Sequence, residues 1–473
     1  MSDDFVEALS RQLGADKVLT DAATLDERRH DYWVLSHLDD LQGRAAPRPL
    51  CVVRPHTVDD VVATVNACRN AGIAIVPFGL GSGVCGGVVA HPERVLLDLS
   101  SMHQTRRIDP VNLLASFDAG KRGSEAEDEV AARGLTIGHW PQSVAVSSVG
   151  GWVATRASGQ FSTANGNIED IVYSIEAVLA DGSVIHAGKA PRASAGPDLR
   201  HLLLGSEGTL GVISGVTLSL RRKPEAQDYR ALLTTSMQQG FDFQRELLQR
   251  GWQPPVMRQY DPIEAQRSFA ANARADHGLL IMVHEGPTER VAAELEASDQ
   301  LARSMGLHDV AATATTGWLD HRNTVPHWRD FLARRIVVDT VEVSAPWDRI
   351  EAIYTGVIAA LSGVPDILNA SAHSSHAYRS GLNLYFSFAV RPEDAAAMAE
   401  RYRMCWQRIV ETTAALGGGI AHHHGIGRVR SPYLHHDLGS SGIAALRKVK
   451  AALDPTGIMN PGVLLPDAVG ASV

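Results

Sequence analysis

The most informative segment of the chain is Gly79-Leu80-Gly81-Ser82-Gly83-Val84-Cys85-Gly86-Gly87, in which five of nine residues are glycine. It follows a predicted strand, Ile73–Pro77. Glycine lets a backbone turn tightly and approach a ligand closely. Successive N–H groups in such a loop can form an anion-binding nest, for which a pyrophosphate is a natural occupant. Because Val88-Val89-Ala90-His91-Pro92 follows in place of a helix, the loop is not a Rossmann fingerprint. Alone, it also fits an ordinary turn.

Three later segments repeat this use of small residues. They are Ser148-Val149-Gly150-Gly151-Trp152-Val153-Ala154-Thr155-Arg156-Ala157-Ser158-Gly159, then Gly166-Asn167-Ile168-Glu169-Asp170, then Leu204-Gly205-Ser206-Glu207-Gly208-Thr209-Leu210-Gly211-Val212-Ile213. Small residues let a backbone lie against a flat ring, and Thr155 and Ser158 add hydroxyl groups. Each segment alone fits a tight turn between strands, but their joint occurrence predicts one ligand site.

The order of the glycine loop, GGWVATRASG, GNIED and GSEGTLGVI resembles the FAD domain of the vanillyl-alcohol oxidase superfamily, from about Arg54 to Leu465. The resemblance implies an α+β fold of two domains, a PCMH-type FAD-binding domain and an α+β cap domain for substrate. It also implies FAD as cofactor, held without a covalent bond, because the loop has no histidine and Cys85 fits a small packing residue. The implied FAD-binding residues are Pro77, Phe78, Gly79, Leu80, Gly81, Ser82, Gly83, Gln142, Ser143, Ser147, Ser148, Thr155, Arg156, Ala157, Ser158, Glu207, Gly208, Thr209, Leu210, Gly211, Val212 and Ile213.

The pattern of apolar segments changes near Lys223-Pro224-Glu225, where the segments become longer. We therefore expect a FAD-binding domain over residues 1–224 with its core at about 46–224, a cap domain over 225–425, and a segment over 426–473 that returns to the first domain. The expected elements include a helix over Val58–Ala71, begun by Thr57 with Asp60 three residues on. Other predicted elements are strands at Leu114–Asp118, Val212–Leu220 and Asn383–Val390, and helices at Ser236–Arg250, Trp347–Leu361 and Ser441–Leu453.

The C-terminal half resembles the alkylglycerone-phosphate synthase family. The similar segments are Ser344-Ala345-Pro346-Trp347-Asp348-Arg349, Gly381-Leu382-Asn383-Leu384-Tyr385-Phe386-Ser387-Phe388-Ala389 and His422-His423-His424-Gly425-Ile426-Gly427. This resemblance implies that the acyl group of acyl-dihydroxyacetone phosphate is exchanged for a long-chain alcohol through an adduct at flavin N5, with no net redox change. The product would be an ether lipid precursor.

Six residues match the catalytic and substrate-binding positions of that family. Tyr385 would move the proton, although a free phenol has a pKa of about 10 and needs polar neighbours to act near neutrality. The resemblance implies catalytic roles for His422, His423, His424 and Arg258, and substrate binding by Arg329. In an extended segment alternate residues face opposite sides, so we expect His422 and His424 to share a face. Without the resemblance, Tyr385 would be interpreted as a core residue of a strand, and each arginine as a charge on the surface.

Two other functions compete with this one. A FAD-linked dehydrogenase of a 2-hydroxy acid such as lactate or glycolate would carry carboxylate metal ligands, but Arg379–Asn383 and His423–Gly425 lack a carboxylate. His373 and His376 could still join the histidine run around a divalent metal, yet we expect no metal. A non-enzymatic flavin-binding protein is the third alternative, and the tyrosine, histidine and arginine set argues against it.

Composition excludes several partners. The net charge of −9 comes from mixed acidic and basic residues, so we expect no nucleic-acid binding. No apolar stretch approaches the roughly 20 residues of a membrane span. A lipid-like substrate would permit peripheral membrane contact. The N-terminus lacks a secretory pattern, and four scattered cysteines favour reduced thiols in a cytoplasmic protein. We expect a homodimer that acts on a small lipid-like or hydroxy-acid substrate.

Overall fold

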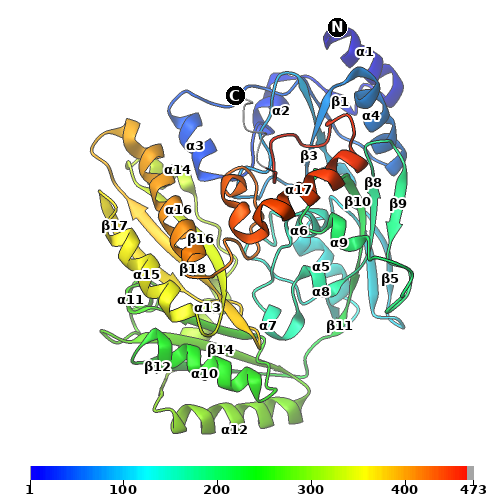
Figure 1. The fold of residues 1–473 in the computed structure, drawn as a ribbon. Coiled ribbons are helices and arrows are strands. Elements are labelled where there is room, and N and C mark those ends of the chain that lie inside the picture. The colour runs from blue at the N-terminus through cyan, green and yellow to red at the C-terminus, as the bar shows by residue number, and fades with distance from the viewer. Residues whose placement is uncertain (1, 466–473) are drawn as a thin grey trace.

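The computed structural model describes residues 2–465, and residues 466–473 of the expected C-terminal segment lie outside this range. Residues 2–222 form an N-terminal lobe, in blue to green in Figure 1. One of its sheets has the order β1-β2-β4-β3, in which β2, β4 and β3 are parallel and β1 is antiparallel to β2. Its elements are α1 (Ser2–Leu13), β1 (Val18–Leu19), α2 (Ala22–Glu27), α3 (Val34–Leu41), β2 (Cys51–Val53), α4 (Val58–Ala71), β3 (Ala74–Phe78) and β4 (Arg94–Asp98).

A second, antiparallel sheet completes this lobe in the order β5-β6-β10-β8-β9. Buried side chains from both sheets and from α4 share one core. The elements are η1 (Leu99–Ser101), β5 (Thr105–Asp109), β6 (Leu114–Asp118), α5 (Gly123–Ala131), β7 (Leu135–Thr136), α6 (Val149–Thr155), α7 (Ser162–Asn165), α8 (Ile168–Ile171), β8 (Val172–Val178), β9 (Val184–Ala187), α9 (Arg200–Leu203), β10 (Val212–Ser219) and β11 (Arg221–Arg222).

The next part of the chain, residues 226–420, forms a cap lobe on a seven-stranded antiparallel sheet of order β15-β12-β14-β13-β17-β18-β16. Its elements are β12 (Ala226–Thr234), α10 (Met237–Gln249), β13 (Val256–Tyr260), α11 (Pro262–Ser268), β14 (Gly278–Gly286), α12 (Thr288–Ser304), β15 (His308–Val310), α13 (Thr313–His321), α14 (Trp328–Leu332), β16 (Val337–Pro346), α15 (Ile350–Ser362), β17 (Ile367–His373), β18 (Gly381–Val390), η2 (Ala395–Ala397) and α16 (Met398–Ala415).

Alternation along the cap strands separates a core face from a face that meets the N-terminal lobe. Side chains of Leu384, Phe386 and Phe388 on β18 join a core with residues of α10, α15 and α16. The residue between the first two, Tyr385, lies on the opposite face, because successive side chains of a strand point to opposite sides. On that opposite face, side chains of β12, β13 and β14 pack with α13 of the cap lobe and with Phe161 of the N-terminal lobe.

The last segment returns to the N-terminal lobe and carries η3 (Ser431–Tyr433) and α17 (His435–Leu453), drawn in red over that lobe in Figure 1. Beyond α17 the chain runs beside β3: the Ile75 N–H donates to the Ile458 carbonyl, and the Asn460 N–H donates to the Ile75 carbonyl. The chain therefore leaves the N-terminal lobe once and comes back.

The four cysteines are all buried and free of disulfide bonds, as the sequence predicts. Among residues 2–465, no helix has both the length and the apolar character needed to cross a membrane.

Candidate active site

A cavity of about 1180 Å³ lies between the two lobes. Small-ligand sites usually measure about 300–1,000 Å³, so this space suits a large ligand together with a smaller one. Gly81, Ser158 and Gly208 from three separate segments line it from the N-terminal lobe, and Tyr385 and His423 line it from the other side. The segments that the sequence analysis groups into one site therefore meet in space.

Glycine is required at three points of the N-terminal wall. A Cβ at Gly79 would lie 2.5 Å from the Ser148 Oγ, and a Cβ at Gly208 would lie 2.8 Å from Pro77. Gly81 has a φ of +72°, and a Cβ there would lie 2.7 Å from the Phe78 ring. The backbone thus forms a close-packed bed at which any larger residue would displace a neighbour.

Two buried carboxylates brace this bed. Asp31 accepts from the Gly87 N–H at 2.8 Å, and Glu207 accepts from the Ile426 N–H at 2.6 Å and the Gly427 N–H at 2.9 Å. Burial raises the pKa of each of these two carboxyl groups to about 7, and the backbone hydrogen bonds only partly offset it. Glu207 thereby ties the bed to the returning C-terminal segment.

Tyr385 presents its hydroxyl to a histidine across the cavity wall. The Tyr385 hydroxyl lies 2.5 Å from the His423 Nε2. Burial raises the pKa of Tyr385 far above the ordinary phenol value, although the Arg258 guanidinium opposes the shift. Burial also lowers the pKa of His423 well below its usual value. The resting pair is therefore a neutral phenol and a neutral imidazole, which can exchange a proton.

The histidine run is curved, and this corrects one expectation. The Glu342 Oε1 accepts backbone N–H groups from His422, His423 and His424 at 3.5, 3.3 and 2.9 Å. Three successive donors can reach one oxygen only if the chain bends around it, so the strand-like alternation does not hold. His423 and His424 line the cavity while His422 does not, so the prediction that His422 and His424 share a face is wrong.

A buried ion pair holds this curve in place. Arg430 lies 2.5 Å from Glu342, and both side chains are fully buried. Burial alone would raise the pKa of Glu342, but the Arg430 guanidinium, with help from His424, holds it well below its ordinary range. Arg430 also donates to the Gly425 carbonyl at 2.8 Å and to the Cys85 Sγ at 3.2 Å. The glycine loop and the histidine run are therefore held by one side chain.

The buried His373 and Glu264 side chains hold Arg258 beside the Tyr385 ring. Arg258 donates to the His373 Nε2 at 2.7 Å, and the His373 Nδ1 lies 2.9 Å from Glu264. Because arginine can only donate, the His373 Nε2 accepts and its Nδ1–H donates to Glu264. The His373 ring stacks on Tyr385 with centroids 4.7 Å apart. Arg258, His373 and Tyr385 therefore form one rigid group.

Three guanidinium groups line the cavity on the cap side: Arg258, Arg267 and Arg322. Arg322 lies over the Trp140 and Phe161 rings at 5.4 and 5.1 Å. Within residues 2–465 neither Arg258 nor Arg322 pairs with a carboxylate, whereas Arg267 pairs with Glu264. Half-buried guanidinium groups without a carboxylate partner favour an anionic ligand.

Arg329 lies elsewhere. Its side chain is 75% exposed on α14, 4.0 Å from Asp40, and does not line the cavity. The structure thus brings together five of the six residues expected to act on substrate, four of them at the cavity surface and His422 behind it, and leaves Arg329 outside.

Comparison with known proteins assigns the two halves of the chain. Residues 49–188 match the model of a FAD binding domain, and residues 223–464 match the model of the C-terminal domain of FAD linked oxidases. The chain belongs to the FAD-linked oxidase family. It is accordingly an enzyme that uses FAD, and the predicted membership of the vanillyl-alcohol oxidase superfamily is confirmed.

The relatives of this FAD-linked oxidase extend over nearly its whole length. The uncharacterized FAD-linked oxidoreductase YgcU of Escherichia coli (strain K12) is 33% identical over 98% of each chain. The alkyldihydroxyacetonephosphate synthase of Caenorhabditis elegans is 28% identical over 94% of this chain and 80% of its own. A solved structure of alkyldihydroxyacetonephosphate synthase covers 97% of this chain and 84% of its own, at 24% identity and a TM-score of 0.81. The last match confirms the α+β fold expected from the sequence.

The bed of this FAD-linked oxidase has the properties that FAD needs. Its glycines allow backbone to approach the ligand, and its size exceeds that of an ordinary small-ligand site. Eighteen of the expected FAD-binding residues line the cavity: Pro77, Phe78, Gly79, Leu80, Gly81, Ser82, Gly83, Gln142, Ser143, Ser147, Ser148, Thr155, Ala157, Ser158, Glu207, Gly208, Gly211 and Ile213. The other four, Arg156, Thr209, Leu210 and Val212, do not line it. Arg156 instead pairs with Glu169 at 3.1 Å.

Several residues of this FAD-linked oxidase site escaped the sequence analysis. Asp31 and Glu342 are isolated acidic residues, and nothing near them in the sequence marks them as buried. Arg322 follows α13 in a stretch that looks like an exposed helix end. Trp318 lies one helical turn before Arg322 on the same face, and this spacing is the one signal that could have indicated a shared site.

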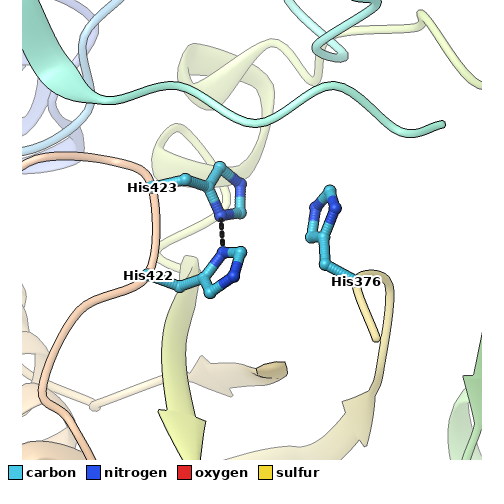
Figure 2. Close-up of side chains that lie close together, drawn as sticks. All are labelled: His376, His422 and His423. Atoms are coloured by element: carbon cyan, nitrogen blue, oxygen red, sulfur yellow. Dashed lines mark hydrogen bonds between the residues drawn. The ribbon is translucent and has the colours of Figure 1, made fainter. Parts of the chain in front are cut away.

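One group of side chains in this FAD-linked oxidase could offer nitrogens to a cation. His376, His422 and His423 each have a ring nitrogen within 4.8 Å of the others. Figure 2 shows His422 and His423 on one loop and His376 across from them. The His376 Nδ1 lies 2.6 Å from the Ser162 hydroxyl, and the His422 and His423 Nδ1 atoms lie 2.7 Å apart. The His376 Nδ1 and the His422 and His423 nitrogens are thus engaged in hydrogen bonds, so a cation bound through them would have to replace these bonds.

Proposed function

We propose that this FAD-linked oxidase exchanges the acyl group of an acyl-dihydroxyacetone phosphate for a long-chain alcohol. The observation that supports it most is the neutral Tyr385–His423 pair, 2.5 Å apart, beside an arginine with no carboxylate partner. Such a pair can take a proton from a carbon next to a carbonyl group and return it, while the arginine holds the phosphate. An exchange without net redox change needs both steps.

Each part of the substrate has a counterpart in the cavity. We propose that Arg258, with Arg322, binds the phosphate, and that Tyr385 receives the proton from the substrate carbon. The histidine run then keeps the Tyr385 hydroxyl in position. Bound FAD supplies the electron-accepting ring. An apolar part of the wall, suited to an acyl or alkyl chain, contains Phe269, Ala270, Ala271, Ala314, Gly317 and Trp318.

The relatives and the course of the chain support this proposal. A relative that covers 94% of this chain is named alkyldihydroxyacetonephosphate synthase. We also propose the domain division expected from the sequence, with FAD bound by residues 1–224 and 426–473 and the substrate by residues 225–425. The return of the chain to β3 fits this division.

Oxidation of a 2-hydroxy acid is the second candidate. The 33% identical relative is named an FAD-linked oxidoreductase, and arginine grips a carboxylate as well as a phosphate. The Tyr385–His423 pair could accept a hydroxyl proton in the same geometry. This candidate leaves the apolar wall without a role, so we rank it second.

A paired assay of the purified holoenzyme tests both candidates. One arm supplies acyl-dihydroxyacetone phosphate with hexadecanol and measures the ether product by mass spectrometry. The other arm supplies lactate and glycolate with an electron-accepting dye and measures dye reduction and flavin bleaching. Ether formation without bleaching is the expected result. Bleaching by a hydroxy acid with no ether product contradicts the proposal and selects the second candidate.

A further inference from the structure

A line of hydrogen-bonded groups leads away from the cavity through the histidine run. The Tyr385 hydroxyl lies 2.5 Å from the His423 Nε2, and the His423 Nδ1 lies 2.7 Å from the His422 Nδ1. The His422 Nε2 lies 2.8 Å from the Tyr378 hydroxyl. Figure 2 shows the middle of this line, where the rings of His422 and His423 come from one loop and face each other through the dashed bond. Every step is within hydrogen-bond distance.

Only one end of the line borders the cavity. Tyr385 and His423 line the cavity. Tyr378 and His422 do not line it, yet both are only half-buried. We therefore take Tyr378, at the end of the line away from the cavity lining, as the group that exchanges protons with solvent.

The hydrogens along this line have two self-consistent orders. A neutral imidazole has one N–H donor and one acceptor nitrogen. If Tyr385 donates to His423, the His423 Nδ1–H donates to His422, and the His422 Nε2–H donates to the Tyr378 oxygen. Shifting one proton across each bond, while Tyr385 gains a proton and Tyr378 loses one, gives the reverse order. Neither order leaves a nitrogen of the line without a partner, so both are available to the same fold.

The surroundings keep this line neutral and hold its far end in place. Burial lowers the pKa of His422 to about 4, and burial together with neighbouring histidines lowers the pKa of His423 well below its usual value. The Asn167 amide donates to the Tyr378 hydroxyl at 2.9 Å, and the Ser158 hydroxyl donates to the Asn167 Oδ1 at 2.7 Å. Tyr378 is therefore anchored to the N-terminal lobe, although it belongs to the cap lobe.

We propose that Tyr385, His423, His422 and Tyr378 form a proton relay through the cavity wall, with His422 and Tyr378 as positioning residues for Tyr385. As the substrate proton reaches the Tyr385 oxygen, the Tyr385 proton moves to the His423 Nε2. The His423 Nδ1 proton moves to His422, and the His422 Nε2 proton moves to Tyr378. The Tyr378 proton moves to water. One proton enters, one leaves, and no electron moves along the line.

The relay rests on the proposed function and adds a reason for it. Each passage reverses the order of hydrogens on both imidazoles. In an exchange without net redox change the proton returns during the same turnover, and its return restores the starting order. An oxidation would release the proton, so both rings would have to be reset before the next turnover. The line thus suits a reaction in which the substrate proton is removed and then returned within one turnover.

The hydrogen order can be measured without any substrate. Nitrogen NMR of holoenzyme labelled with ¹⁵N-histidine reports which ring nitrogen carries the proton, and His422→Gln and His423→Gln spectra assign the signals. We expect both rings to be neutral, with one proton between the two Nδ1 atoms. Protons on both Nε2 atoms, a charged ring, or a stoichiometric transition metal in the purified holoenzyme would overturn the relay.

Kinetics of Tyr378→Phe test the passage itself, with acyl-dihydroxyacetone phosphate and hexadecanol as substrates. The control is Tyr173→Phe, whose hydroxyl bonds to the Lys189 carbonyl on an exposed part of the N-terminal lobe. We expect Tyr378→Phe to lower kcat about 10-fold, which is less than the ~10²–10⁴-fold contribution of the acid–base group itself. KM and flavin content should stay unchanged, and the curved dependence of kcat on deuterium fraction should become linear.

Two other outcomes contradict the relay. One is an unchanged kcat and deuterium dependence in Tyr378→Phe. The other is a loss confined to flavin content or thermal midpoint, which would assign a purely structural role to Tyr378. If wild-type enzyme turns over neither substrate class, the proposed function fails, while the ring protons of His422 and His423 still decide the relay.

Discussion

Tyr385 shows how far a single residue can be interpreted from sequence. Its position in a strand predicts packing in the core, and only the family resemblance assigns it a role in proton transfer. The structure places its hydroxyl 2.5 Å from His423, a neighbour 38 positions along the chain. Tyr385 lies outside the cap core because alternate residues of β18 point to opposite faces of the sheet. Asp31 and Arg322 had no such resemblance to mark them, since burial and ring contacts depend on distant parts of the chain.

Tyr385→Phe removes the hydroxyl and keeps the ring. We expect flavin content to remain and turnover to fall by about 10²–10⁴-fold, the usual contribution of a positioned acid–base group. Absorbance at the flavin band and initial rates with acyl-dihydroxyacetone phosphate measure the two effects. Turnover equal to wild type would remove Tyr385 from the reaction.

Arg322→Gln tests the cationic side of the cavity. Because Arg322 has no carboxylate partner in the described structure, its loss should weaken binding of an anionic substrate and leave the chemical step intact. We expect KM to rise about 10-fold, equivalent to ~1.4 kcal/mol of lost uniform binding, with kcat little changed. Arg334→Gln, on the exposed surface after α14, is the matched control. Arg329→Gln in the same assay examines the position that sequence resemblance favours.

At the scale of elements, local signals predict the helix ends well. The predicted helix Val58–Ala71 is observed without change, because Thr57 and Asp60 form a capping box and Gly72 closes the end in the left-handed region. Local signals do not predict backbone structure that depends on contacts with residues far away in the sequence. The predicted helix Ser441–Leu453 is the part of α17 that follows the non-helical Gly439, and the sequence does not predict the helical turn before it, from His435. The histidine run bends because Glu342, on another strand, gathers its N–H groups.

Glu342→Gln should destabilise the histidine run through Arg430. Removing one partner of a buried ion pair leaves the other charge uncompensated, which costs about 3–5 kcal/mol. We expect a lower urea midpoint for Glu342→Gln than for wild type. The double variant Glu342→Gln with Arg430→Met should recover part of the loss, because no buried charge remains. Equal midpoints for wild type and Glu342→Gln would contradict the role of this pair.

The raised pKa of Glu207 predicts that the folding stability of the protein depends on pH. This pKa is raised from 4.5 to about 7 in the fold, so the folded state binds the proton more tightly than the unfolded state. The resulting stability is fully present below about pH 4.5 and is lost as pH rises through about 7. Glu207→Gln should therefore lose less stability than wild type between pH 5 and pH 8. Parallel thermal midpoints across that range would refute the prediction.

At the scale of the whole molecule, the resemblance predicted an α+β fold of two parts, and the structure confirms that class. The resemblance also leads us to expect that the last segment returns to the first lobe, as part of the proposed domain division. The sequence could not predict how tightly the lobes are joined, because that joint depends on Glu207, Arg430 and Asn167 meeting residues far away in the chain.

Bound FAD should stabilise the whole chain. A ligand that binds only the folded state at about 100 times its Kd contributes ~2.7 kcal/mol. We expect yellow protein, release of the flavin by acid, and a lower thermal midpoint for the apoprotein than for the holoenzyme. Release is expected because Cys85 is buried on Arg430 and does not line the cavity. Flavin that stays with the acid precipitate would demonstrate a covalent bond.

The backbone bridge between Ile75 and Met459 has a consequence for biosynthesis. A ribosome emits about 5–20 residues per second and completes N-terminal units first. Here the strand around Ile75 emerges long before its neighbour Met459. The nascent chain therefore carries an open hydrogen-bonding edge until Met459 has been translated, and a premature stop before Met459 would leave that edge permanently available to other chains.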